Sequence, residues 1–150
     1  MKKLIRVIPL VFIGLIAALT LTAGGGSKAP VVWPAGDIQW TANPAMAAMS
    51  IAPLWGDPNK GAYGALKKVA GGTDFGWHTH SSDQKVVSIS GTIELTLEGG
   101  SPKELTSGSY VFIAGGTKHH SVCQAGADCV FFEQQPGKSD YNPVKMAAEK

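Results

Sequence analysis

Short runs rich in β-branched and aromatic residues, separated by glycines at close intervals, dominate the chain from Tyr63 onward. The spacing of these glycines is close to the roughly 8 to 12 residues that separate turns in β-sandwiches and barrels. The pattern therefore predicts an all-β barrel. Its strands are expected at residues 65–70, 86–90, 92–97, 110–113 and 130–133.

The segment before these runs has no comparable strand pattern. Residues 30–68 are rich in Pro, Gly, Ala and Trp and lack a sustained helical period. We expect loops, short strands and one weak helical turn near residues 45–49. Because large aromatic side chains dominate core burial, Trp33, Trp40 and Trp55 are expected to cover the core or a subunit contact.

The N-terminus has the pattern of a secretory signal peptide. A basic head precedes an apolar run over residues 7–21, and small residues follow it. We expect residues 1–29 to be a signal peptide, cleaved after residue 23 or 29, and the domain to be periplasmic or secreted. The alternative is an uncleaved anchor, since a membrane span needs about 20 apolar residues, but Pro9 interrupts the run. Membrane contact is expected only through such an uncleaved segment.

Length and charge limit the partners of the remaining chain. With 150 residues in all, residues 30–150 are enough for one domain. Four of the 13 basic residues lie before residue 30, which leaves nine lysines, no arginine and 11 acidic residues after it. Arginine is the side chain best suited to phosphate and base contacts, so no nucleic-acid partner is expected. A small-molecule ligand is expected, and so is a homodimer, because an open barrel leaves edge strands.

The two cysteines, Cys123 and Cys129, are expected to form a disulfide. An oxidising compartment outside the cytoplasm lets two thiols pair and persist. The intervening Gln-Ala-Gly-Ala-Asp resembles a turn, so the pair would close a hairpin. Two free thiols or a soft metal pair remain the alternatives.

All four histidines fall in two clusters, His78-Thr79-His80 and His119-His120. Residues two apart on a strand share a face, so His78 and His80 can offer imidazole nitrogens to one cation. A third ligand would come from the second cluster. Neutral nitrogen donors of this kind suit zinc, copper, iron or nickel.

The histidine pattern resembles the first motif of the cupin superfamily. That motif has a glycine, His-x-His, a glutamate and a second glycine at fixed spacing. This chain matches the spacing with Gly72, His78, His80 and Gly91, and has Gln84 in place of the glutamate.

The second cupin motif is also present in part. It has a glycine, Pro-x-Gly, a histidine and an asparagine, and here Gly108, Gly116 and His119 match. Ala114 replaces the proline and Cys123 the asparagine. More narrowly, the chain looks like small exported bacterial cupins.

This resemblance implies a double-stranded β-helix, or jelly-roll barrel, that holds one divalent transition metal. The metal is expected to be Fe(II), with Zn, Mn and Ni as alternatives, and the implied ligands are His78, His80, Gln84 and His119. His120 would point to the other side of its strand, unless a bulge exchanges it with His119. Asp83 is a minor alternative ligand, because side chains alternate along a strand and its neighbour Gln84 takes the inward face.

Glutamine in place of glutamate leaves an essentially three-histidine site with a neutral, weak fourth ligand that cannot act as a base. Three-histidine iron sites are similar to those of cupin dioxygenases. The implied function is a dioxygenase-type enzyme acting on a small chelating substrate. The alternative is a non-catalytic cupin that binds or senses a metal or small ligand, because one fold serves many functions.

Glu133 could supply the missing acid. If Cys123 and Cys129 pair across a hairpin, the ladder places His119 opposite Glu133 on one face. Glu133 would then orient His119 through its second ring nitrogen, or act as the base that Gln84 cannot be. The alternative is a strand glutamate that faces solvent.

Overall fold

The computed structural model describes residues 29–145. The predicted signal peptide therefore lies almost wholly outside the described residues. All the elements below lie within the compact unit Val32–Lys150. No helix within residues 29–145 has the length and apolar character that crossing a membrane requires.

Strands make up nearly all the regular structure of the described residues. One short 3-10 helix, Ala35–Asp37, precedes them. The strands are β1 (Thr41–Ala42), β2 (Met49–Gly56), β3 (Tyr63–Val69), β4 (Asp74–Thr79), β5 (Gln84–Ser90), β6 (Ile93–Leu97), β7 (Lys103–Leu105), β8 (Tyr110–Ile113), β9 (His119–Cys123), β10 (Cys129–Gln135) and β11 (Asn142–Pro143).

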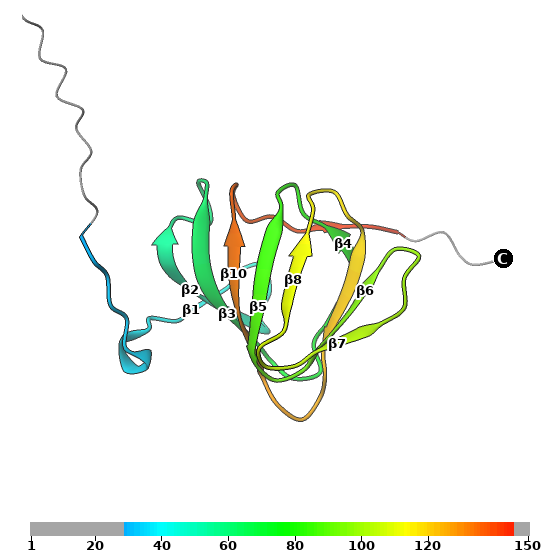
Figure 1. The fold of residues 1–150 in the computed structure, drawn as a ribbon, viewed down its shortest axis with the longest axis horizontal. Coiled ribbons are helices and arrows are strands. Elements are labelled where there is room, and N and C mark those ends of the chain that lie inside the picture. Colours follow the sequence, from blue (N-terminus) through cyan, green and yellow to red (C-terminus); the bar gives the residue numbers. More distant parts are fainter. Residues whose placement is uncertain (1–28, 146–150) are drawn as a thin grey trace, which may run out of the picture. The chain divides into compact units, whose positions relative to one another are not determined.

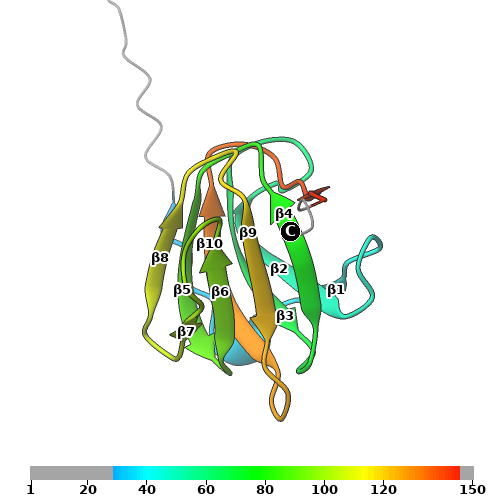
Figure 2. The ribbon, with the colours of Figure 1, turned by 90° about the vertical axis from the view of Figure 1, so that its right-hand side faces the viewer.

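The strands form two antiparallel sheets that enclose one interior. Figure 1 shows the larger sheet, whose strand order is β1-β2-β3-β10-β5-β8, and Figure 2 shows the smaller, with the order β11-β4-β9-β6-β7. From β3 to β6, and again from β8 to β11, consecutive strands alternate between the two sheets. This alternation is the double-stranded β-helix, and it confirms the predicted all-β jelly roll.

The inward positions change character along the barrel. On β10 the side chains of Cys129, Phe131, Glu133 and Gln135 are all buried, as the period of two requires. At one end of the barrel Cys129 and Phe131 belong to an apolar core that also contains Met49, Val69, Val86, Ile93 and Cys123. Farther along β10 the inward side chains become polar, so this part of the interior is built for something other than packing.

The disulfide links the two sheets. Cys123 ends β9, Cys129 begins β10, and their sulfurs are bonded. However, β9 pairs with β4 and β6, whereas β10 pairs with β3 and β5. The expected Cys123–Cys129 hairpin, with His119 opposite Glu133, is therefore wrong, because the connection crosses from one sheet to the other.

A glycine makes room for this crossing. Gly91, in the turn between β5 and β6, has a φ of +74°. A Cβ atom there would lie 2.8 Å from the Cα of Cys129 and 2.6 Å from the carbonyl oxygen of Asp128. Both the conformation and the close approach therefore require glycine.

The segment before Tyr63 is more regular than its sequence suggests. Residues 44–48 form turns, not a helix, and β2 begins at Met49 as a full eight-residue strand. Trp33 and Trp55 remain 49% and 46% exposed, so they do not cover the core of this chain. Trp40 instead lies beneath the ammonium of Lys68, 4.8 Å from the ring centroid.

Loss of the disulfide should lower stability without changing the fold. The double variant Cys123→Ser/Cys129→Ser, or reduced wild-type protein, should lose about 2 kcal/mol of unfolding free energy, the loop-closure value for a ring this small. Urea unfolding with and without reductant measures it. Reductant should have no effect on the double variant, and an unchanged midpoint for reduced wild type would contradict the stabilising role.

Candidate metal centre

Two of the histidines form a cross-strand pair. His78 on β4 lies directly opposite His119 on β9. Both side chains point inward, with exposures of 3% and 2%. Their ring centroids are 4.2 Å apart. Two imidazoles from neighbouring strands thus meet at one place on the inner face of the smaller sheet.

His80 completes the group from just beyond the end of β4. Its ring centroid lies 5.0 Å from that of His78 and 5.3 Å from that of His119. One nitrogen from each of the three rings can be chosen so that all lie within 4.8 Å of one another. Within residues 29–145, no other group of His, Cys, Asp and Glu side chains gathers in this way.

Each imidazole is held by a backbone carbonyl through the same ring nitrogen. The Nδ1 atoms of His78 and His119 lie 2.8 and 2.9 Å from the carbonyl oxygens two residues earlier, at Gly76 and Thr117. His80 Nδ1 lies 2.5 Å from the carbonyl oxygen of Asp140. A carbonyl can only accept, so Nδ1 carries the proton in all three rings. The Nε2 lone pairs are left for another partner.

Burial keeps these rings neutral. Desolvation lowers the pKa of His78 to about 4, and it also lowers the pKa of His80 and His119. At neutral pH all three are therefore uncharged, which is the form that binds a metal ion.

His120 and Asp83 point away from this group. His120 Nε2 lies 2.7 Å from the Asp74 carboxylate, and its ring stacks on Trp77. Asp83 is exposed and accepts a hydrogen bond from the backbone N–H of Gly115. The expected inward direction of His119 and outward direction of Asp83 agree with this geometry.

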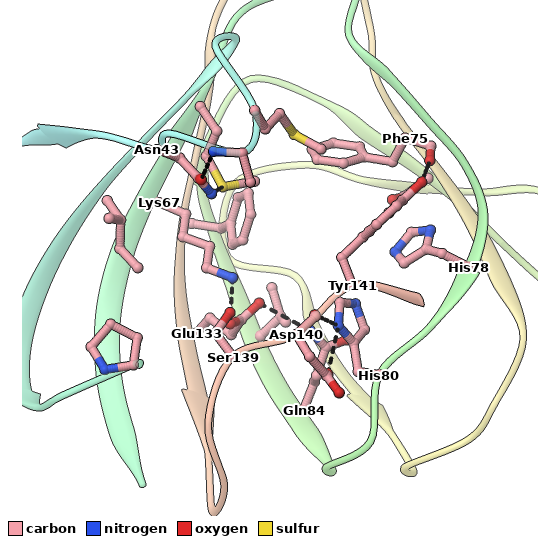
Figure 3. A pocket seen from close by; sticks show the side chains of 18 of the residues that line it. Asn43, Lys67, Phe75, His78, His80, Gln84, Glu133, Ser139, Asp140 and Tyr141 are labelled. Atoms are coloured by element: carbon pink, nitrogen blue, oxygen red, sulfur yellow. Dashed lines mark hydrogen bonds and ion pairs between the residues drawn. The ribbon is translucent and has the colours of Figure 1, made fainter. Parts of the chain in front are cut away.

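The three histidines line a cavity of about 460 Å³ inside the barrel. Figure 3 shows His78 and His80 facing Lys67 and Glu133 across it, with Gln84 between them. Apolar side chains line most of the remaining wall: Met46, Met49, Phe75, Val86, Leu95, Val111, Ile113 and Phe131. The size suits a small molecule.

The C-terminal segment closes one side of the cavity. The carboxylate of Asp140 accepts hydrogen bonds from the backbone and side chain of Ser81, next to His80. The Tyr141 hydroxyl donates to the carbonyl of Phe75, and its ring centroid is 4.7 Å from that of His78. Thus two histidines depend on residues that follow the last long strand.

Gln84 lies where the cupin motif has glutamate, and the structure explains the exchange. The side chain is 4% exposed, and its Nε2 donates to Glu133 Oε2 at 3.1 Å. A glutamate at this position would place two carboxylates against each other. The hydrogen bond also leaves the Gln84 carbonyl oxygen as the atom that could bind a cation.

Glu133 is the acidic group of the interior, but its contacts differ from the expected ones. It receives hydrogen bonds from Tyr63, Gln84 and Gln135 and an ion pair from Lys67. It does not orient His119, whose Nδ1 is bound by Thr117. Burial alone would raise the pKa of Glu133, but the Lys67 ammonium and the donated hydrogen bonds outweigh burial and hold the pKa below its usual value.

These contacts make Glu133 a poor general base. A carboxylate with four donors and a lowered pKa holds a proton weakly. Glu133 faces the cavity, as expected. The reason differs from the expected one: β10 belongs to the sheet opposite His119, and no hairpin pairs the two residues.

Four functional side chains have no clear signal in the sequence. Lys67 belongs to a Lys-Lys pair, and nothing local tells which of the two faces inward. Tyr63, Asp140 and Tyr141 lie at strand ends or in the tail. Their contacts span 60 to 70 residues of chain, so only the folded arrangement reveals them.

The donor set fits the divalent transition metal that the cupin motifs imply. Three neutral imidazoles present Nε2 lone pairs from fixed orientations, and a neutral amide oxygen is adjacent. Soft or borderline ions that prefer nitrogen, such as Fe(II), Zn(II) and Ni(II), are the ones such donors select.

The two-sheet barrel has the fold of solved RmlC-like cupins. The chain belongs to the family described as "Domain of unknown function (DUF4437)", which matches residues 26–141. No curated protein matches the sequence.

Several solved structures share the fold. KdgF from Halomonas sp. is 19% identical with a TM-score of 0.58, over 71% of this chain and 94% of that one. The polyketide cyclase RemF from Streptomyces resistomycificus is 17% identical with a TM-score of 0.64, over 80% and 89%. The DMSP lyase DddQ from Ruegeria pomeroyi DSS-3 is 16% identical with a TM-score of 0.60, over 73% and 62%. At these identities the likeness establishes the fold.

Replacing the amide at position 84 by an acid should destabilise the barrel. Gln84→Glu sets a second carboxylate against Glu133 and should cost about 2 kcal/mol of unfolding free energy at pH 7. Like-charge repulsion raises the folded-state pKa of this pair. The loss should therefore shrink as the pH falls and one carboxyl takes up a proton.

A matched control tests the same chemistry at the surface. Gln124 Nε2 donates to Glu104 at 3.0 Å in an exposed pair. Gln124→Glu should cost less than about 0.5 kcal/mol, because solvent screens exposed charges. Urea unfolding at pH 5 and pH 7 compares the two, and equal losses would contradict the account of Gln84.

Proposed function

We propose that this chain is a metal-dependent cupin in which His78, His80 and His119 hold one divalent transition metal. Gln84 contributes a weak fourth ligand through its carbonyl oxygen, and Fe(II) is the favoured ion. The observation that carries the proposal is the shared Nδ1–carbonyl hydrogen bonding, which leaves three Nε2 lone pairs for one ion at the cavity wall.

The favoured activity is oxygen-dependent chemistry of the dioxygenase type on a small chelating substrate. When bound, Fe(II) would supply the redox chemistry with dioxygen, and the protein's side chains would bind and orient the substrate. The two acidic side chains that line the cavity are engaged, Glu133 by four donors and Asp140 by Ser81. This lack of a free carboxylate base favours a substrate that arrives as an anion over a reaction that needs proton abstraction.

The same observation supports a second function, a non-catalytic cupin that binds or senses a metal or small ligand. A cavity without a free carboxylate base can bind a chelating molecule and leave it unchanged. The fold does not choose between the two functions, because one fold serves many chemistries.

We also propose that the protein is exported. Residues 1–29 would act as a signal peptide, and residues 30–150 would work as one domain in the periplasm or outside the cell. The disulfide between Cys123 and Cys129 supports this location, because such bonds persist in oxidising compartments.

Metal content should depend on the inward histidines and not on His120. Periplasmically expressed protein should carry one transition metal ion per chain, and His78→Ala and His119→Ala should lose most of it, because each removes a nitrogen donor. His120→Ala, the outward neighbour, should retain it. Plasma mass spectrometry measures the content, and equal metal in all four proteins would rule out this centre.

Oxygen uptake distinguishes the two functions. Fe(II)-loaded protein is mixed with diketones, phenols and thiols in a sealed oxygen electrode, with the Zn(II)-loaded protein as control. An oxygenase should consume one O₂ per substrate molecule only in the iron form. A binding protein should consume none and give ligand-dependent shifts in unfolding temperature with either metal.

A further inference from the structure

The Lys67 ammonium, which lines the cavity, has more hydrogen-bond donors than acceptors around it. Lys67 points inward from β3 and is 6% exposed. Its ammonium has three N–H donors. Within the described residues it has one acceptor, the Glu133 carboxylate at 2.6 Å. The remaining donors belong to a side chain that lines the cavity.

Glu133 has other partners besides Lys67. Its two oxygens already accept hydrogen bonds from Tyr63, Gln84 and Gln135, all buried. Taking an ammonium out of water is costly, and replacing a buried ion pair by uncharged groups is often neutral or stabilising. The Lys67–Glu133 ion pair is therefore not needed for the stability of the fold. Recognition of a ligand is the remaining reason for a buried ammonium at this position.

The position of Lys67 relative to the histidines fits such a role. Glu133 connects Lys67 on one side to Gln84, the candidate fourth ligand, on the other. The cation and the three histidines thus face one cavity, whose remaining wall is mostly apolar.

We propose that Lys67 binds an anionic group of the ligand, and that the ligand is a small organic acid with an apolar body. Its carboxylate pairs with Lys67, a second oxygen faces the three histidines, and the body packs against side chains such as Phe75, Val86 and Phe131. Only the contact between the second oxygen and the histidines rests on the proposed function, because it requires a bound metal. The anchoring of the carboxylate depends on Lys67 itself.

The test compares an acid with its amide. Binding of 3-phenylpropanoate and 3-phenylpropanamide is measured by calorimetry on wild-type protein, both metal-free and Zn(II)-loaded. The acid should bind at least about tenfold more tightly than the amide in both forms, equivalent to about 1.4 kcal/mol. No preference for the acid in either form would overturn the proposal.

The variants separate Lys67 from the metal. Lys67→Met/Glu133→Gln replaces the ion pair by neutral groups of similar size and avoids an unpaired buried carboxylate. It should abolish the preference for the acid and leave Zn(II) content unchanged. Lys68→Met, the outward neighbour that lies over Trp40, should keep the preference. An undiminished preference in the folded double variant would show that the acid binds elsewhere.

A conservative variant controls for misfolding of the double variant. Lys67→Arg keeps the charge and should retain the preference for the acid at changed affinity, whereas a preference lost with the charge intact would contradict the role. If wild-type protein binds no metal, the proposed function fails while the metal-free comparison still tests Lys67.

Discussion

The hydrogen bonds from three imidazole Nδ1 atoms to backbone carbonyls determine what this barrel can do. Without them, each ring could rotate or change tautomer, and the burial of three histidines would only be costly. The carbonyls come from unlike places: the bulged start of β4, the turn before β9, and the C-terminal segment. The backbone itself therefore fixes which nitrogen of each ring is free.

The interior is divided between packing and chemistry. The apolar core, which includes the disulfide, stabilises one part of the barrel, and the polar group around Glu133 occupies another. Gln84 lies between the polar group around Glu133 and the three histidines. Its amide N–H donates to Glu133, and its carbonyl oxygen does not take part in that contact. The acidic side chain that the cupin motif places at position 84 is thus found on β10, one strand away, where Lys67 neutralises it.

Much of the fold could be predicted from local pattern. The run at residues 110–113 coincides with β8. His78 on β4 and His80, just beyond its end, both face the cavity, as the period of two predicts. The hairpin expected through Cys123 and Cys129 is wrong, because a short loop between strands does not reveal that the chain crosses to the other sheet. Short strands are expected before Tyr63, but not the full length of β2, because Pro53 lies within it, at a shift in register where a missing N–H is tolerated.

The candidate metal centre is more visible in the sequence than its surroundings. Two histidine clusters with motif spacing mark the three candidate ligands, since spacing along strands is local information. The partners of Glu133 come from β3, β5 and β10, and Asp140 reaches His80 from 60 residues away. Such contacts arise from topology, so no window of sequence contains them.

The most direct test of the account is the position of the metal itself. Crystals of Zn(II)-loaded protein, measured at the zinc absorption edge, should give one anomalous peak bonded by Nε2 of His78, His80 and His119. Each Nδ1 should remain on its carbonyl. A peak at another site, bonding through Nδ1, or no peak in metal-loaded crystals would contradict the account.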